Sequence, residues 1–286
     1  MSGRATPTRA SRPTNAAALL GFVQLEFGFL LGPPDGRYLM RAEPDGPTEA
    51  VLVLSTLGSP ERRRLGGRRA RAIKDAEPTP VPTSRATVVR PEPFDSRAGA
   101  SAWLAALRDD REAARAEHDA AVRVLNLALR AQRAARADPY IAEVSAERSL
   151  VARIGFGRGD AVAGGRFGEA LELPRAAARR VTRSMEAPEE RFAALLGARK
   201  QALVAEELVL RARVDLNARR PREAALQARV ALEALMAELP DADLARWREP
   251  VSEAANTALR AQPDSKGLHQ AVEAMEAVLR RHRLRG

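Results

Sequence analysis

The stretch from Pro93 to Pro139 limits the fold of this chain more than any other feature, because no proline lies between these two residues. Proline interrupts a helix, since it lacks a backbone donor and clashes with the preceding turn. Residues suited to a single helix face recur here at intervals of three, four or seven: Leu104, Leu107, Ala114, His118, Ala121, Leu125 and Leu129. The spacing predicts a helix of about forty residues.

A second helix is predicted to follow directly. Asp138 and Pro139 are suited to its N-cap and first turn. Apolar residues that would share one face of this helix are Ile141, Val144, Val151 and Ile154. We expect the helix to end at the glycine-rich segment 155–168.

A third long helix is predicted to begin at Pro188, where two glutamates follow near the positive end of its dipole. Leu196, Leu203 and Leu210 are spaced by seven residues, which predicts a seam that packs against another helix. Further helices are expected at about 222–239, 243–260 and 265–283.

The N-terminal part of the chain has strand patterns instead. Between residues 20 and 31 apolar and polar residues alternate, and the Pro/Gly cluster 32–36 indicates a turn. Compact apolar runs at 38–40, 50–54 and 86–90 are bounded by glycine or proline, as expected for strands.

Together these patterns predict an α+β fold that is predominantly α. We expect a disordered tail at residues 1–15 and a small antiparallel β module at 17–95, which contains a basic and proline-rich loop at 61–85. A helical domain of residues 96–286 follows, as a long-helix bundle or helical hairpins, with a glycine-rich break at 155–168.

Composition excludes several classes of function. The chain has no cysteine, so it forms no disulfides, thiolate metal sites or cysteine nucleophiles. No secretory signal pattern and no apolar run long enough to span a membrane are present, so a cytoplasmic protein is expected. The net charge is +10, and all but three of the 47 basic residues are arginine. An anionic partner would account for this excess of positive charge. The codon usage of a G+C-rich genome would account for it equally well.

The glycine-rich segment RIGFGRGDAVAGGRFG, residues 153–168, raises the question of a phosphate-binding loop. A dinucleotide fingerprint needs G-x-G-x-x-G after a strand, and here Gly155, Gly157 and Gly159 have a different spacing. The lysine and hydroxyl residue that complete a P-loop are also missing. We therefore interpret the segment as a structural loop between helices.

A basic run at 61–74 is the candidate polyanion-binding site. It contains Arg62, Arg63, Arg64, Arg68, Arg69, Arg71 and Lys74, with two glycines that would let it follow a phosphate backbone. The run has no aromatic residue for base stacking. A weaker arginine cluster, at residues 175, 179 and 183, repeats every four residues.

No catalytic, cofactor-binding or metal-binding motif is found. His118 lies on the predicted apolar helix face and is interpreted as a hydrogen-bonded, partly buried residue, while His269 and His282 lack metal-site spacing. Adjacent acidic pairs such as Asp109 and Asp110 point about 100° apart on a helix and do not form an acid/base pair by themselves.

Two resemblances are apparent. The segment LNARRPREAALQARVALEALMAELP, residues 216–240, resembles the second helix of a tetratricopeptide repeat, which implies stacked helix pairs and a peptide-binding surface. The segments LNLALRAQRAARADPYIAEV and RIGFGRGDAVAGGRFGEALELP look like those of a group of uncharacterised proteins from high-G+C bacteria, and this likeness implies no function.

The leading hypothesis from the sequence is a non-catalytic helical scaffold or protein–protein interaction protein, which binds a protein partner or self-associates through its helix seams. The alternative is a nucleic-acid or acidic-surface binder that uses residues 61–74. The third hypothesis is a nucleotide-using enzyme that acts through residues 155–168.

Overall fold

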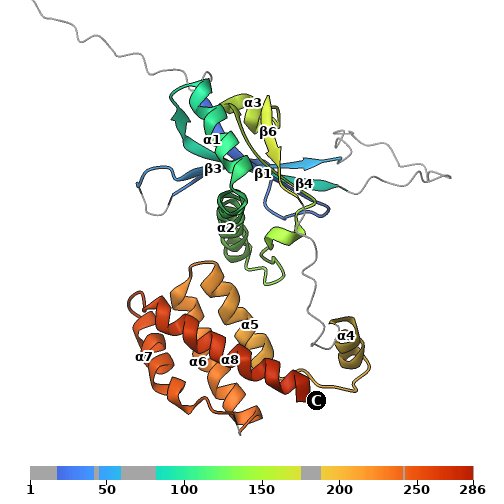
Figure 1. The fold of residues 1–286 in the computed structure, drawn as a ribbon, viewed down its shortest axis with the longest axis vertical. Coiled ribbons are helices and arrows are strands. Elements are labelled where there is room, and N and C mark those ends of the chain that lie inside the picture. Colours follow the sequence, from blue (N-terminus) through green and yellow to red (C-terminus); the bar gives the residue numbers. More distant parts are fainter. Residues whose placement is uncertain (1–17, 42–44, 59–81, 175–187, 241, 286) are drawn as a thin grey trace, which may run out of the picture. The chain divides into compact units, whose positions relative to one another are not determined.

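A computed structural model describes residues 18–41, 45–58, 82–174, 188–240 and 242–285. The chain divides into two compact units, which we call the sheet unit (residues 1–177) and the helical unit (residues 178–286) (Figure 1). The boundary expected between residues 95 and 96 therefore falls inside the first unit. The predicted tail at 1–15 and most of the loop 61–85 lie outside the described residues.

The described part of the sheet unit contains a six-stranded antiparallel sheet with the order β2-β3-β4-β1-β5-β6. Its strands are β1 (Leu19–Phe27), β2 (Gly36–Met40), β3 (Ala50–Leu57), β4 (Thr83–Phe94), β5 (Val151–Arg158) and β6 (Glu169–Glu172). The first four strands confirm the strand patterns predicted from the sequence. The sequence had predicted a sheet confined to the N-terminal part. The last two strands show that this prediction is wrong.

Alternation along β1 distributes its side chains between two buried faces. Leu25 and Phe27 pack on one face in the main core of the unit. Phe22 faces the other side and packs with Val162 and Phe167. Both faces are covered, because α1 and α2 lie over the first and the short helix α3 (Gly159–Ala163) lies over the second (Figure 1).

The predicted forty-residue helix is divided into α1 (Arg97–Asp109) and α2 (Arg111–Arg136). The division occurs at Asp110, whose carboxylate accepts hydrogen bonds from the backbone amides of Glu112 and Ala113 at 2.9 and 3.0 Å. This side chain replaces the missing helical partners at the start of α2. Helical periodicity therefore located the helical region but not the break in it.

The helix predicted from Asp138 to residue 154 is wrong. These residues form an irregular segment, a short 3-10 helix η1 (Ala146–Arg148) and the start of β5. Asn126 on α2 holds Val144 by two hydrogen bonds of 2.8 Å, one to its carbonyl oxygen and one from its amide. Pairing of β5 with β1 along the whole strand then satisfies the backbone groups that a helix would have satisfied.

The interpretation of residues 155–168 as a break between helices is also wrong, because the segment begins inside β5. A Cβ atom at Gly155 would lie 2.4 Å from the backbone oxygen of Glu169, and one at Gly157 would lie 2.8 Å from Val162. These glycines let β6 and α3 approach the strand closely. Their role is steric, and only Gly165 among the glycines of this segment has a positive φ, of 74°.

The described residues of the helical unit form α4 (Pro188–Leu196), α5 (Val204–Asn217), α6 (Pro221–Glu238), η2 (Ala245–Trp247), α7 (Arg248–Ala258) and α8 (Ser265–Arg285). The helices predicted at 222–239 and 265–283 match α6 and α8. The helix predicted at 243–260 is shorter and is preceded by η2. Leu232, Leu235 and Met275 are completely or almost completely buried in the core of this unit.

The long helix predicted from Pro188 ends at Leu196, and the predicted leucine seam does not form, since of its three residues only Leu203 packs against the core of this unit. Leu196 and Leu210 are 72% and 57% exposed, whereas Val209 and Leu216 are buried on α5. The seam does not form because α5 begins separately at Val204, whose amide donates to Glu238 at the end of α6. The fold thus contains both α-helices and a β-sheet.

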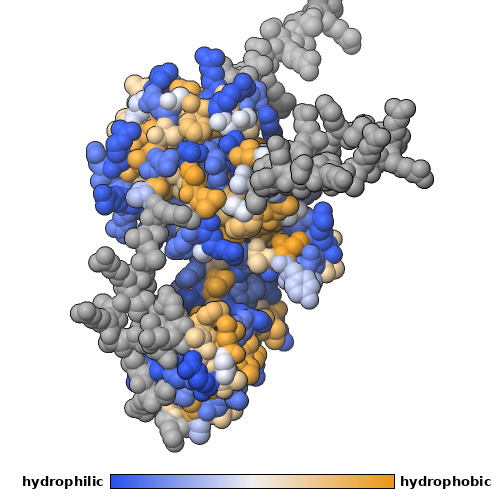
Figure 2. Space-filling model, turned by 90° about the vertical axis from the view of Figure 1, so that its right-hand side faces the viewer, coloured by the Kyte–Doolittle hydropathy of each residue, from blue (hydrophilic) through white to orange (hydrophobic). Residues whose placement is uncertain are grey.

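Hydrophobic side chains also reach the surface, where Figure 2 shows them among hydrophilic ones on one face of the molecule. Within the described ranges, no helix combines the length and the apolar character that crossing a membrane requires.

Candidate functional site

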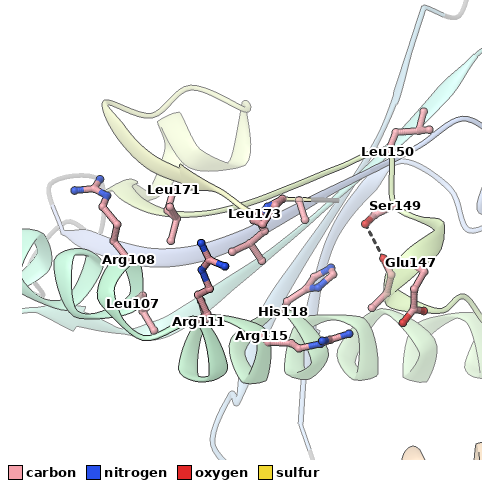
Figure 3. A pocket seen from close by; sticks show the side chains of 14 residues that line it. Leu107, Arg108, Arg111, Arg115, His118, Glu147, Ser149, Leu150, Leu171 and Leu173 are labelled. Carbon is pink, nitrogen blue, oxygen red and sulfur yellow. Dashed lines mark hydrogen bonds between the residues drawn. The ribbon is translucent and has the colours of Figure 1, made fainter. Parts of the chain in front are cut away.

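A cavity of about 460 Å³ lies in the sheet unit, between the junction of α1 and α2 and the strands β5 and β6. Figure 3 shows its lining side chains. They are Leu107, Arg108, Arg111, Ala114, Arg115, His118, Ala146, Glu147, Ser149, Leu150, Ala152, Leu171, Leu173 and Pro174. Its volume falls in the range typical of small-molecule pockets.

The helix side of the cavity is cationic. Arg108 lies in the last turn of α1, and Arg111 is the first residue of α2. Arg115 and His118 follow one and two turns later, at a spacing that keeps them near one face of the helix. In Figure 3, Arg111 and His118 point from α2 toward β6, which carries Leu171, and toward Leu173 just after it.

Several described arginines pair with carboxylates. Arg85 pairs with Glu26, Arg191 with Glu206 and Arg213 with Glu276, all at 3.1 Å or less. Within the described part of the chain, Arg108, Arg111 and Arg115 make no ion pair. Arg108 and Arg111 therefore offer guanidinium donors to a group that enters the cavity, while Arg115 also interacts with Glu147.

The strand side of the cavity is apolar. Ala152 on β5 is a buried residue of the main core, and Leu171 and Leu173 pack against that core while they line the cavity. Leu173 is placed by a backbone hydrogen bond of 2.9 Å, which its amide donates to the carbonyl oxygen of Ala152. The cavity thus has a charged wall on the helices and an apolar wall on the strands.

Glu147 supplies a negative charge at the opposite end of the cavity from Arg108 (Figure 3). The pKa of Glu147 is lowered, first by a hydrogen bond from its own backbone amide and then by one from Ser145. Arg115 and His118 lower it further through their proximity. Glu147 is therefore ionised at neutral pH.

His118 is partly buried, and its Nε2 atom is inaccessible to water. This atom makes no hydrogen bond with the described residues, so the prediction of a hydrogen-bonded histidine is wrong for Nε2. Desolvation lowers the pKa of His118 below 6.5, and nearby Asp119 and Glu147 only partly oppose this effect. The imidazole is therefore neutral at pH 7, which leaves the three arginines as the positive charges of the wall.

The predicted polyanion site does not belong to the described part of the chain. Arg62, Arg63, Arg64, Arg68, Arg69, Arg71 and Lys74 lie outside the described residues, as do the arginines at 175, 179 and 183. No group of three or more metal-ligating side chains occurs in the part of the chain that the structure describes.

The glycine-rich segment does follow a strand, contrary to the prediction, but it does not form a phosphate cradle. Helix α3 has five residues, and its first turn carries Asp160, which pairs with Arg37 at 3.1 Å. A carboxylate at this position opposes anion binding. Nucleotide binding by this segment gains no support from the geometry.

Sequence reasoning missed Arg108, Arg111 and Arg115. Their signal was present, because Arg111 and Arg115 are four residues apart and His118 follows three residues later. The same spacing fits a helix face that is merely in contact with solvent. Only the residues on the opposite wall show that this face borders a cavity.

Comparisons of the chain with protein-family models, curated proteins and solved structures give no match.

Proposed function

We propose that the sheet unit binds a small molecule through an anionic group, in the cavity between α1–α2 and the strands. The observation that supports this proposal is the set of three arginines, Arg108, Arg111 and Arg115, which line one cavity and lack carboxylate partners among the described residues. A guanidinium presents several donors in a fixed plane and binds carboxylates or phosphates through two parallel hydrogen bonds.

Binding is favoured over catalysis by the arrangement of the polar groups. Ser149 Oγ donates a hydrogen bond of 2.8 Å to the carbonyl oxygen of Ala146, and His118 Nε2 has no described partner. These two side chains therefore do not form a nucleophile–base pair of the kind that activates a serine.

The proposal is tested by NMR spectra of the arginine side chains in the full chain, recorded during titration with acetate and with inorganic phosphate. The Nε–H resonances of Arg111 and Arg115 should shift in a saturable manner. Arg281, which is exposed on α8, serves as an internal control. Shifts of equal size at Arg281 would indicate general charge screening and would refute the site.

A pair of variants tests the same point by affinity. Arg111→Gln should weaken anion binding by about tenfold or more, because a charge-assisted hydrogen bond is lost. Arg281→Gln should leave the affinity unchanged. Equal effects of the two substitutions would remove Arg111 from the site.

A second candidate function is the protein interaction expected from the sequence, which we propose for the helical unit. It is supported by apolar side chains on the surface of this unit, among them Leu196, Leu210 and Val230, which are 72%, 57% and 55% exposed.

Sedimentation of the full chain over a range of concentrations tests self-association, one form of this interaction. If Leu210 takes part, Leu210→Gln should shift the equilibrium toward the monomer, whereas Leu39→Gln, an exposed site on β2, should not. A chain that is monomeric at every concentration would exclude self-association.

A further inference from the structure

We propose that the ligand of the cavity is an amphipathic monoanion, an alkyl or aryl carboxylate whose apolar body lies against the strand wall. This inference rests on the proposed anion-binding function and adds the chemical class of the ligand. It is drawn from the unequal walls of the cavity and from the charge at its far end.

The apolar wall indicates a ligand with an apolar body. Leu171 and Leu173 present hydrocarbon to the same space that Arg111 enters from the helix (Figure 3). An inorganic anion would occupy the arginine side and leave this hydrocarbon in contact with water. A ligand with a hydrocarbon body removes both surfaces from water, and each methylene that is buried tightens binding about threefold to fourfold.

The far end of the cavity indicates that the ligand has a single anionic group. Glu147 is ionised there, since hydrogen bonds from its own amide and from Ser145 lower its pKa. The groups on α2 that face Glu147 are the cationic Arg115 and the neutral His118. A second carboxylate at this end of the ligand would be repelled by Glu147 without an additional cation to offset it.

The inference is tested by calorimetric titration of the full chain with acetate, hexanoate, octanoate and decanoate at one ionic strength. Affinity should rise about threefold to fourfold per methylene until the apolar wall is covered. 1-Octanol, which lacks the charge, and octanedioate, which carries two, should each bind at least about tenfold more weakly than octanoate, because one lacks the arginine contacts and the other meets Glu147.

Variants separate the two walls. Leu173→Gln should flatten the dependence on chain length while acetate binding persists, and Leu39→Gln, at the exposed site on β2, should change neither. The series on the unsubstituted chain gives the same answer if Leu173→Gln fails to fold.

The outcomes are distinguishable. Equal affinities for acetate and octanoate would overturn this inference and leave the anion-binding function intact. Absence of binding by every anion would refute the proposed function itself. Octanol that binds as tightly as octanoate would overturn the charged head group, and octanedioate that binds as tightly would overturn the single charge.

Discussion

The two units of this protein build their cores from side chains of different size. In the sheet unit, Phe22, Phe27, Leu52 and Ile154 are among the largest fully buried side chains. The helical unit relies on small ones, and the alanines buried in its core cluster include Ala205, Ala212, Ala224, Ala225, Ala228, Ala231, Ala258 and Ala271. Large side chains fill the space of about 10 Å between a sheet and the layer that covers it, whereas alanine lets helices approach closely.

This difference in core side chains determines which substitutions destabilise each unit. The sheet unit is sensitive to added atoms at closely packed glycines, and the helical unit is sensitive to the loss of its few large side chains. In the sheet unit, glycine at Gly155 leaves room for backbone and ring atoms that are already in place. In the helical unit, a few large side chains such as Leu232 and Met275 fill the gaps that the alanines leave. Protein interiors are close-packed in general, so both cores are sensitive to changes in side-chain volume, but at different positions.

The largest effect is expected at Leu232 in the helical unit. Leu232→Ala should lower the free energy of unfolding by about 2 to 5 kcal/mol, because the side chain is 1% exposed and its loss leaves a cavity. Urea unfolding followed by circular dichroism measures this change.

Leu210→Ala is the matched control, since Leu210 is 57% exposed. It should change the free energy of unfolding by less than about 0.5 kcal/mol. A loss at Leu210 as large as that at Leu232 would mean that the seven-residue leucine seam lies in a core after all.

A smaller effect is expected at Gly155 in the sheet unit. Gly155→Ala should lower the free energy of unfolding by about 1 to 3 kcal/mol, because the new methyl group would lie 2.4 Å from the backbone oxygen of Glu169. Gly168→Ala is the control, since no atom lies within 4 Å of the added methyl group and φ is not positive. Equal melting temperatures for the two variants would show that β6 yields easily.

The smallest effect concerns pH. Burial lowers the pKa of His118 below 6.5, so the unfolded chain binds a proton at this residue more readily than the folded one. The contribution of His118 to the free energy of unfolding should therefore be highest above about pH 6.5. It should fall as the pH decreases toward the lower pKa of His118 in the folded state. NMR titration of the His118 ring gives that pKa.

The comparison of stability at pH 7.5 and 5.5 completes this test. His118→Gln should remove the contribution of this residue to the pH dependence, while His282→Gln, at an exposed site on α8, should not. A His118 titration midpoint above 6.5 would contradict the desolvated environment and would locate a stabilising negative charge nearer than Glu147.

The sequence located the strands β1 to β4 and the helices α6 and α8 because their signals are local. Alternation near β1 and helical spacing near α8 each reflect the side of one element that faces a core. The prediction was wrong at residues 139–154, where Val151 and Ile154 fit a helical spacing as well as a strand. Pairing of β5 with β1 decided between the two, and that pairing is a property of distant residues.

The candidate site could not be assembled from the sequence for the same reason. His118 was identified by its position on an apolar face, but nothing local indicated that Arg111 would lie opposite Leu173. Their proximity depends on β6 returning to the sheet beside β5, and that return depends on the glycines that permit close approach.

By itself, the sequence determined where the strands β1 to β4 and the helices α6 and α8 lie and which of their side chains are apolar, because propensity and periodicity act within a few residues along the chain. The tertiary structure alone decided which leucines of α5 are buried, which strand completes the sheet and which arginines share a cavity with leucines. Burial and pairing are decided by contacts between residues far apart in the sequence, and the free energy of those contacts outweighs the small local preferences of each segment.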